Sequence, residues 1–143
     1  MADVLYTKDI LRLAADVPRL ERLDEADYSA RKVSPICGSR IDVDITIENG
    51  RVADYGQSVR ACALGQASAA IMGAAVVGLP LSVFEQAAED MAAFLKGERE
   101  APPEAFGVAG VFAPAKDYKS RHASILLPFE AMAEIAAKAR QTA

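Results

Sequence analysis

The segment from position 41 to position 50 constrains the fold more than any other part of this 143-residue sequence. Between positions 41 and 48, isoleucine and valine alternate strictly with aspartate, threonine and glutamate, and the run ends at Asn49-Gly50. Such alternation is typical of a strand with one buried face, and Asn-Gly is a preferred dipeptide of two-residue hairpin turns. The pattern predicts an antiparallel hairpin whose second strand returns over residues 51–61.

Helical patterns flank this hairpin on both sides. Apolar residues at roughly helical spacing predict an N-terminal helix that ends near Ala15, before Pro18. Residues 16–36 show no periodicity and are expected to form a connection. Residues 63–78 are dominated by alanine, serine and glycine, which predicts a closely packed, buried helix directly after the hairpin.

Two further helices are predicted in the C-terminal half. The first follows Ser82 and Glu85, which have the spacing of a capping box, and it ends at Gly97. Residues 98–118 contain three prolines and are expected to form a loop, after which a last helix takes Pro128 in its first turn. The expected fold class is α+β, with a small antiparallel sheet packed against several helices in a single domain over residues 1–143.

Charge and hydropathy exclude two classes of partner. The formal net charge is −4 and no run of like charges occurs, so a nucleic-acid partner is not expected. No stretch approaches the 18 or so consecutive apolar residues of a membrane span, and the first residues lack a signal-peptide core. We therefore expect a cytoplasmic protein with no membrane association.

The two cysteines are the first candidates for chemistry, because cysteines in a reducing compartment rarely form a structural disulfide. Cys37 precedes the predicted hairpin and is followed by Gly38, which places it on a loop. Cys62 lies where the small-residue helix begins, and the free N–H groups and positive dipole of that turn favour a thiolate. Each cysteine alone is also compatible with an inert core residue.

His122 is the only histidine, and it lies between a proline-rich segment and the last predicted helix. A lone histidine is a metal ligand in some proteins and a surface or hydrogen-bonded residue in others. A third role, as a base beside a Cys62 nucleophile, is also open. The sequence has no phosphate-binding glycine loop, no Cys-x-x-Cys and no His-Glu-x-x-His motif, so we expect no enzymatic activity.

Taken in order, these features resemble the IscU, SufU and NifU N-terminal family of iron–sulfur cluster assembly scaffolds. Pro18-Arg19 resembles the family's Asn-Pro-Arg segment, and Pro35-x-Cys37-Gly38 resembles its Pro-x-Cys-Gly-Asp motif. Ala61-Cys62 and the helix after it resemble the family's Gly-Cys segment. The cysteines are 25 positions apart, one before the hairpin and one after it, so both are expected at one end of the sheet.

Two positions depart from the family pattern. Residues 118–132 resemble the segment around the family's third cysteine but contain no cysteine. That cysteine falls on His122, Ala123 or Ser124, depending on the alignment, and the aromatic and small residues further along favour Ser124. Ser39 replaces the aspartate that follows Cys-Gly in the family.

The resemblance implies a scaffold or carrier protein that holds iron, a transient iron–sulfur cluster or zinc at Cys37, Cys62 and His122. This ligand set is weaker than three thiolates, because a neutral serine hydroxyl binds soft metal ions poorly. The implied partners are a cysteine desulfurase, an iron donor and acceptor apoproteins. The alternatives are a desulfurase-binding or sulfur-accepting regulatory protein and a zinc-binding structural protein.

Overall fold

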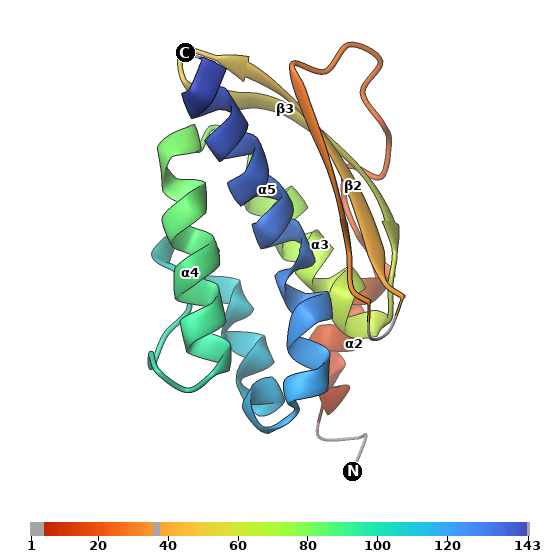
Figure 1. Cartoon of the computed structure of the whole chain (residues 1–143). Coiled ribbons are helices and arrows are strands. Elements are labelled where there is room, and N and C mark those ends of the chain that lie inside the picture. Colours follow the sequence, from red (N-terminus) through yellow and green to blue (C-terminus); the bar gives the residue numbers. More distant parts are fainter. Residues whose placement is uncertain (1–4, 36–37, 143) are drawn as a thin grey trace.

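The structure, a computed structural model, describes residues 5–35 and 38–142, and shows one twisted sheet with the longer helices packed on one of its faces (Figure 1). No helix in these two ranges is long and apolar enough to cross a bilayer. In the list that follows, η marks a 3₁₀ helix. The elements are α2 (Lys8–Ala15), β1 (Tyr28–Val33), β2 (Arg40–Glu48), β3 (Arg51–Arg60), α3 (Ala63–Ala75), η1 (Leu81–Val83), α4 (Phe84–Leu95), η2 (Glu104–Asp117), η3 (Lys119–Arg121) and α5 (His122–Thr142).

The sheet has the strand order β1-β2-β3, with both pairs antiparallel. β2 and β3 form the predicted hairpin, and its two turn residues, Asn49 and Gly50, have φ angles of 55° and 76°. Positive φ at both central residues gives the turn whose twist matches that of the strands. Ile41, Val43 and Ile45 are fully buried against the helices, as the alternation predicts. The α+β fold class is confirmed.

β1 contradicts the expectation that residues 16–36 form only a connection. Ala30 is its one buried residue, so the strand carries no alternating apolar signal. β1 is held instead by pairing with β2 and by side-chain bonds from Ser29 to Asp44 and from Arg31 to Asp42. These partners lie more than ten residues away, where local sequence patterns do not reach.

The predicted helices around the core are confirmed, although one start signal is wrong. α3 is buried along most of its length, as its small residues predict. Ser82 and Glu85 do not form a capping box, because η1 precedes α4 and the Phe84 N–H bonds to the Leu81 carbonyl. α4 ends at Leu95, and Gly97, two residues later, has a φ of 81°, the left-handed conformation that often follows a helix end.

Residues 104–117, labelled η2, form two short helical segments separated by a kink at Phe106, rather than the expected loop. Every third residue of this segment is buried: Phe106, Ala109, Phe112 and Ala115. A 3₁₀ helix has three residues per turn, so side chains at this spacing lie on one face. The spacing therefore explains both the helix type and the packing of its aromatic residues, including the edge-on contact of Phe106 with Phe129.

α5 begins at His122, earlier than predicted, so Pro128 lies in its second turn rather than its first. Proline has no N–H to donate to the carbonyl four residues earlier, which belongs to Ser124. α5 then runs along the sheet and contacts α3, α4 and β1. Near its end Tyr28 and Thr142 share a hydroxyl hydrogen bond, and Lys138 Nζ donates to the Ser29 carbonyl at 3.2 Å.

Candidate metal and sulfur site

The loop between β1 and β2 carries the first predicted ligand, Cys37, which lies outside the described residues. The described ends of this loop are joined by two backbone hydrogen bonds, from Ser34 N–H to the Ser39 carbonyl at 2.8 Å and from Gly38 N–H to the Ser34 carbonyl at 2.9 Å. Gly38 has a φ of 71°. A residue with a side chain is strained in this conformation, which explains the glycine after Cys37.

Cys62, the second predicted ligand, is the residue that begins α3. Its backbone is extended, its carbonyl accepts the first helical bond from Gln66 N–H at 2.9 Å, and the residue is half-buried. β3 ends only two residues earlier, at Arg60, which pairs with Arg40 at the start of β2. The segments that carry the two cysteines therefore meet at one end of the sheet, on either side of the hairpin.

The first turn of α5 reaches the same end of the sheet. Ser124 is 1% exposed and donates a hydrogen bond to Ser39 Oγ at 3.2 Å, and Ser39 is itself 3% exposed. A Cβ atom added to Gly65 in α3 would lie 3.5 Å from the Ser124 carbonyl oxygen. Three segments thus converge: the loop before β2, the first turn of α3 and the first turn of α5. The two serines that depart from the family pattern lie in direct contact.

His122, the third predicted ligand, is half-buried at the start of α5. Its Nε2 atom lies 2.7 Å from the Ala115 carbonyl oxygen. A carbonyl only accepts hydrogen bonds, so Nε2 carries a proton, and in the neutral imidazole the lone pair is then on Nδ1. Histidines that bind metals through one ring nitrogen commonly donate the other N–H in this way.

Within the two described ranges, no group of three or more His, Cys, Asp and Glu residues is placed to hold a metal ion. The predicted set of Cys37, Cys62 and His122 includes a residue outside those ranges. It therefore stays a prediction, and the structure establishes only that the segments around these residues converge.

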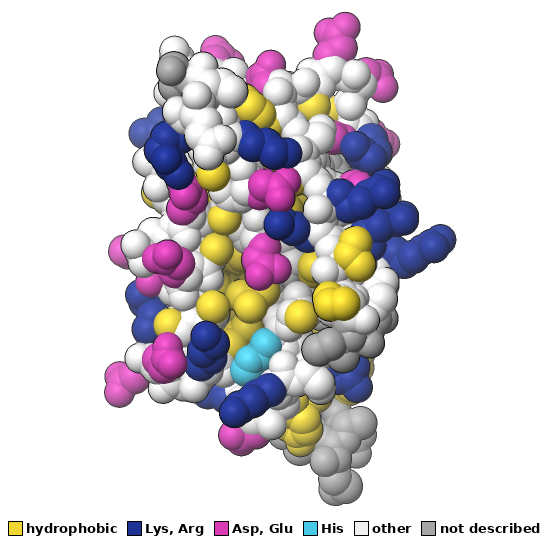
Figure 2. Space-filling model, viewed as in Figure 1, with side chains coloured by type: hydrophobic (Ala, Val, Ile, Leu, Met, Phe, Trp, Pro, Cys, Tyr) yellow, Lys and Arg dark blue, Asp and Glu magenta, His cyan; other side chains and the backbone are white. Residues whose placement is uncertain are grey.

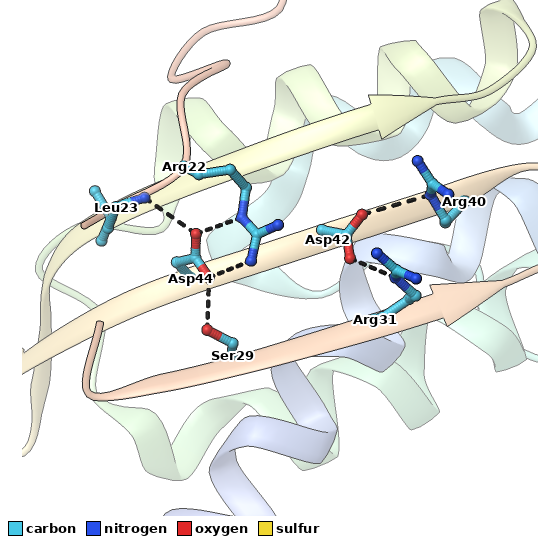
Figure 3. Close-up of polar contacts among 7 residues, drawn as sticks. All are labelled: Arg22, Leu23, Ser29, Arg31, Arg40, Asp42 and Asp44. Atoms are coloured by element: carbon cyan, nitrogen blue, oxygen red, sulfur yellow. Dashed lines mark hydrogen bonds and ion pairs between the residues drawn. The ribbon is translucent and has the colours of Figure 1, made fainter. Parts of the chain in front are cut away.

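The sequence reasoning missed a polar network on the outer face of the sheet, where Asp42 and Asp44 of β2 are buried despite their alternation with apolar residues (Figure 3). Asp44 accepts bonds from Arg22 Nε at 2.6 Å and Nη2 at 2.9 Å, from Leu23 N–H at 3.0 Å and from the Ser29 hydroxyl. The Arg22 guanidinium, above all, lowers the pKa of Asp44. This carboxylate ties the connection after α2 to the sheet.

The Pro18-Arg19 pair, which resembles the family's Asn-Pro-Arg segment, also has a place in this connection. The buried Gln57 side chain of β3 donates to the Pro18 carbonyl at 2.9 Å, and the Gln57 N–H donates to the Arg19 carbonyl at 3.0 Å. The pair therefore lies over the sheet and α3, where Gly73 approaches it closely. Its observed contacts are with β3 and α3, so they are structural contacts within the fold.

Comparison with known proteins agrees with this geometry. The family model described as NifU-like N terminal domain matches residues 5–124. The crystal structure of a nitrogen-fixing NifU-like protein (N-terminal) from Brucella abortus has 37% sequence identity, covers 99% of both chains and superposes with a TM-score of 0.93.

A putative iron–sulfur cluster assembly scaffold protein for the SUF system from Fervidobacterium islandicum AW-1 has 17% identity. It covers 90% of this chain and 93% of its own, with a TM-score of 0.82, which is a likeness of fold. The comparison with curated proteins gave no match. The family match and the Brucella structure together show that the chain belongs to the NifU-like N-terminal domain family.

Proposed function

We propose that this protein is a scaffold or carrier in iron–sulfur cluster assembly, and that it holds iron or a cluster as cargo through Cys37 and Cys62. The observation that carries the proposal is the convergence of the loop before β2 with the first turns of α3 and α5. Membership of the NifU-like N-terminal domain family supports the same function. The protein then has no reaction of its own, and its sulfur and iron come from a cysteine desulfurase and an iron donor.

The ligand set that we propose is two thiolates and one imidazole. Cys62 is favoured by its position at the start of α3, two residues after the end of β3, where the three segments converge. His122 is favoured because its Nε2–H is held by the Ala115 carbonyl, which leaves Nδ1 able to coordinate. Such a set suits zinc as well as iron, because both accept thiolate and imidazole ligands.

The contact between Ser39 and Ser124 bears on the affinity of this site for its cargo. The two hydroxyls are buried and hydrogen-bonded to each other. Ser39 lies where the family resemblance places an aspartate, and Ser124 lies where the favoured alignment places the third cysteine. A neutral hydroxyl is a poor ligand for a soft metal ion. We therefore expect the cargo to be held weakly and released readily.

The same contact favours a second candidate function, a sulfur acceptor that binds the desulfurase without assembling a cluster. In this reaction the Cys62 thiolate attacks the outer sulfur of the desulfurase persulfide. The sulfur–sulfur bond breaks, the desulfurase thiolate leaves, and Cys62 carries the new persulfide. Two thiols are enough for this step, whereas a stable cluster needs more ligands.

Anaerobic reconstitution with ferrous iron and sulfide tests the scaffold proposal. Visible absorption and iron per chain are measured for the wild type, Cys37→Ser, Cys62→Ser and His122→Ala. We expect colour and bound iron in the wild type, loss of both in the cysteine variants and faster loss of iron in His122→Ala. A wild type as colourless as Cys62→Ser would refute the scaffold function.

A gain-of-ligand pair sharpens the test. Ser124→Cys places a thiol where the three segments converge, whereas Ser120→Cys adds one at an exposed position of η3. Iron retention should increase in the first variant alone.

For the sulfur-acceptor function, incubation with a cysteine desulfurase and cysteine should add the mass of one sulfur to the wild type and none to Cys62→Ser. Metal analysis of the freshly purified protein tests whether the site holds zinc instead of iron.

A further inference from the structure

A cluster of three arginines lies on the outer face of the sheet, at the end where the cysteine-bearing segments meet. This arginine patch consists of Arg31 in β1, Arg40 in β2 and Arg60 in β3. The strand register places Arg40 directly opposite Arg60. It also places Arg31 opposite Asp42, and Figure 3 shows both Arg31 and Arg40 beside that carboxylate. The side chains of Arg31 and Arg40 are 59% and 36% exposed, and Arg60 is exposed as well.

The charges in the arginine patch are not balanced. Asp42 is the one carboxylate paired with it in the described part of the chain, at 2.6 Å from Arg31 Nε and 3.5 Å from Arg40 Nε. Arg60 forms no ion pair within the described residues. Three positive charges thus share one negative charge, on a protein whose formal net charge is −4.

This arrangement is unfavourable for the isolated chain. Like charges directly opposite each other on neighbouring strands destabilise a sheet. Asp42 pairs with Arg31 and Arg40 and reduces the repulsion there, but it does not pair with Arg60. Local features that oppose stability without compensation are expected at functional surfaces.

The position of the patch connects it to the candidate site. Arg40 follows Gly38 and Ser39 directly, and Arg60 is two residues before Cys62. The same cross-strand row includes Val33, which is 54% exposed and adds an apolar contact. Figure 2 shows Lys and Arg side chains projecting from the side of the molecule on which Figure 1 shows the sheet.

We propose that the arginine patch docks an acidic surface of a partner protein and brings that partner to the cysteines. The inference rests on the proposed function in one respect: the proposed function gives the reason for docking, which is the exchange of sulfur, iron or a cluster. Exposed guanidiniums on an open sheet face suit the carboxylates of a protein surface and steer its approach. Nucleic acid is disfavoured by the acidic net charge of the chain.

The test uses two probes of equal length, a deca-glutamate peptide and single-stranded deoxythymidine decamer, titrated into the wild type at low salt and followed by amide NMR shifts. The peptide should shift the amides at the paired ends of β1, β2 and β3. Arg60→Glu should weaken its binding roughly tenfold. Arg12→Glu makes the same charge change at an exposed arginine of α2 and should leave the affinity within about twofold.

Three outcomes overturn the proposal: shifts that do not map to these strand ends, equal weakening by Arg60→Glu and Arg12→Glu, or tighter binding of the oligonucleotide than of the peptide. Iron retention after reconstitution is measured on the same variants. Arg60→Glu should retain iron as the wild type does. Loss of peptide binding with normal iron content therefore separates this inference from the proposed scaffold function, which fails when the reconstituted wild type is as colourless as Cys62→Ser.

Discussion

The outer face of the sheet contains two buried carboxylates, Asp44 and Asp42, whose surroundings differ sharply (Figure 3). Asp44 receives bonds from a guanidinium, a backbone N–H and a hydroxyl, and the connection after α2 covers it. Asp42 lies two residues nearer the candidate site and is shared by two exposed guanidiniums. The cross-strand row that contains Asp44, called the closed row below, is thus covered by the connection after α2. The row that contains Asp42 exposes positively charged side chains.

The difference shows that β2 has two roles, one in fixing the fold and one in presenting a charged surface. Around Asp44 the charges are paired and the hydrogen bonds are numerous, which fixes the connection in place. Around Asp42 the arginines exceed the acids, which leaves a surface that another molecule can neutralise. The following predictions test this contrast, beginning with the largest expected effect.

Among the variants considered, Gly56→Ala in the closed row should lower the free energy of unfolding most. Gly56 lies opposite Asp44, and a Cβ atom at this position would be 2.1 Å from the backbone carbonyl oxygen of Glu21. The connection must move, so we expect a loss of about 3 kcal/mol in unfolding free energy, measured by urea denaturation. Gly110→Ala meets no atom within 4 Å and serves as the control. Equal stability of the two variants would show that the connection is not held tightly.

Asp44→Asn should lower the unfolding free energy by about 2 kcal/mol, because the amide cannot accept all of the bonds that the carboxylate receives. The estimate is moderate because the Arg22 side chain is 51% exposed. Thermal unfolding followed by circular dichroism measures the effect. Asp24→Asn removes an exposed carboxylate of the same connection and should change little. A similar loss in both variants would contradict the role assigned to Asp44.

Acid should erase part of this difference. The Arg22 hydrogen bond lowers the pKa of Asp44 in the folded state, so the carboxylate stabilises the fold above its unfolded pKa of about 3.9. That stabilisation is lost as the pH falls through the lower folded pKa. The stability gap between the wild type and Asp44→Asn should therefore shrink from pH 6 to pH 3 in urea denaturation. A gap that stays constant over this range would exclude the ion pair as its cause.

Asp42→Asn should have a smaller effect, about 1 kcal/mol, because its arginine partners are exposed. The variant leaves the arginine patch without its carboxylate, so added salt should recover part of the loss by screening the repulsion. Urea denaturation at low and high salt measures both effects. A loss as large as that of Asp44→Asn would remove the contrast between the two rows.

Arg60→Glu should stabilise the protein slightly, by about 0.5 kcal/mol, because it turns a repulsive pair with Arg40 into an attractive one. Arg60→Lys keeps the charge and should leave the unfolding free energy unchanged. The combination of higher stability with weaker binding of an acidic peptide is the signature expected of a functional charge. Destabilisation by Arg60→Glu would mean that the arginine has a structural role.

Much of the fold was predictable, because local patterns carry it. The hairpin followed from strict alternation and Asn49-Gly50, and α3 followed from its small residues. β1 was missed because Ala30 is its one buried residue and distant carboxylates hold the strand. η2 was missed because burial at every third residue differs from the 3.6-residue period of an α-helix.

The candidate site was predictable only in part. The spacing of the cysteines and the family resemblance indicated that their segments and Ser124 meet at one end of the sheet. The contact between Ser39 and Ser124 and the bond from His122 to Ala115 depend on packing, which the sequence does not encode locally. The arginine patch depends on the register that pairs Arg40 with Arg60, and this pairing is visible only once the strands are aligned.

The bonds that fasten the end of α5 to the beginning of β1 have a consequence for synthesis of the protein. Tyr28 and Thr142, which share a hydroxyl hydrogen bond, are 114 positions apart. The β2-β3 hairpin closes a short loop and is available early, whereas β1 receives its helical cover only after α5 has been synthesised. Until then the face of β1 that α5 covers stays exposed, so the nascent chain is most prone to aggregation in the interval before α5 folds.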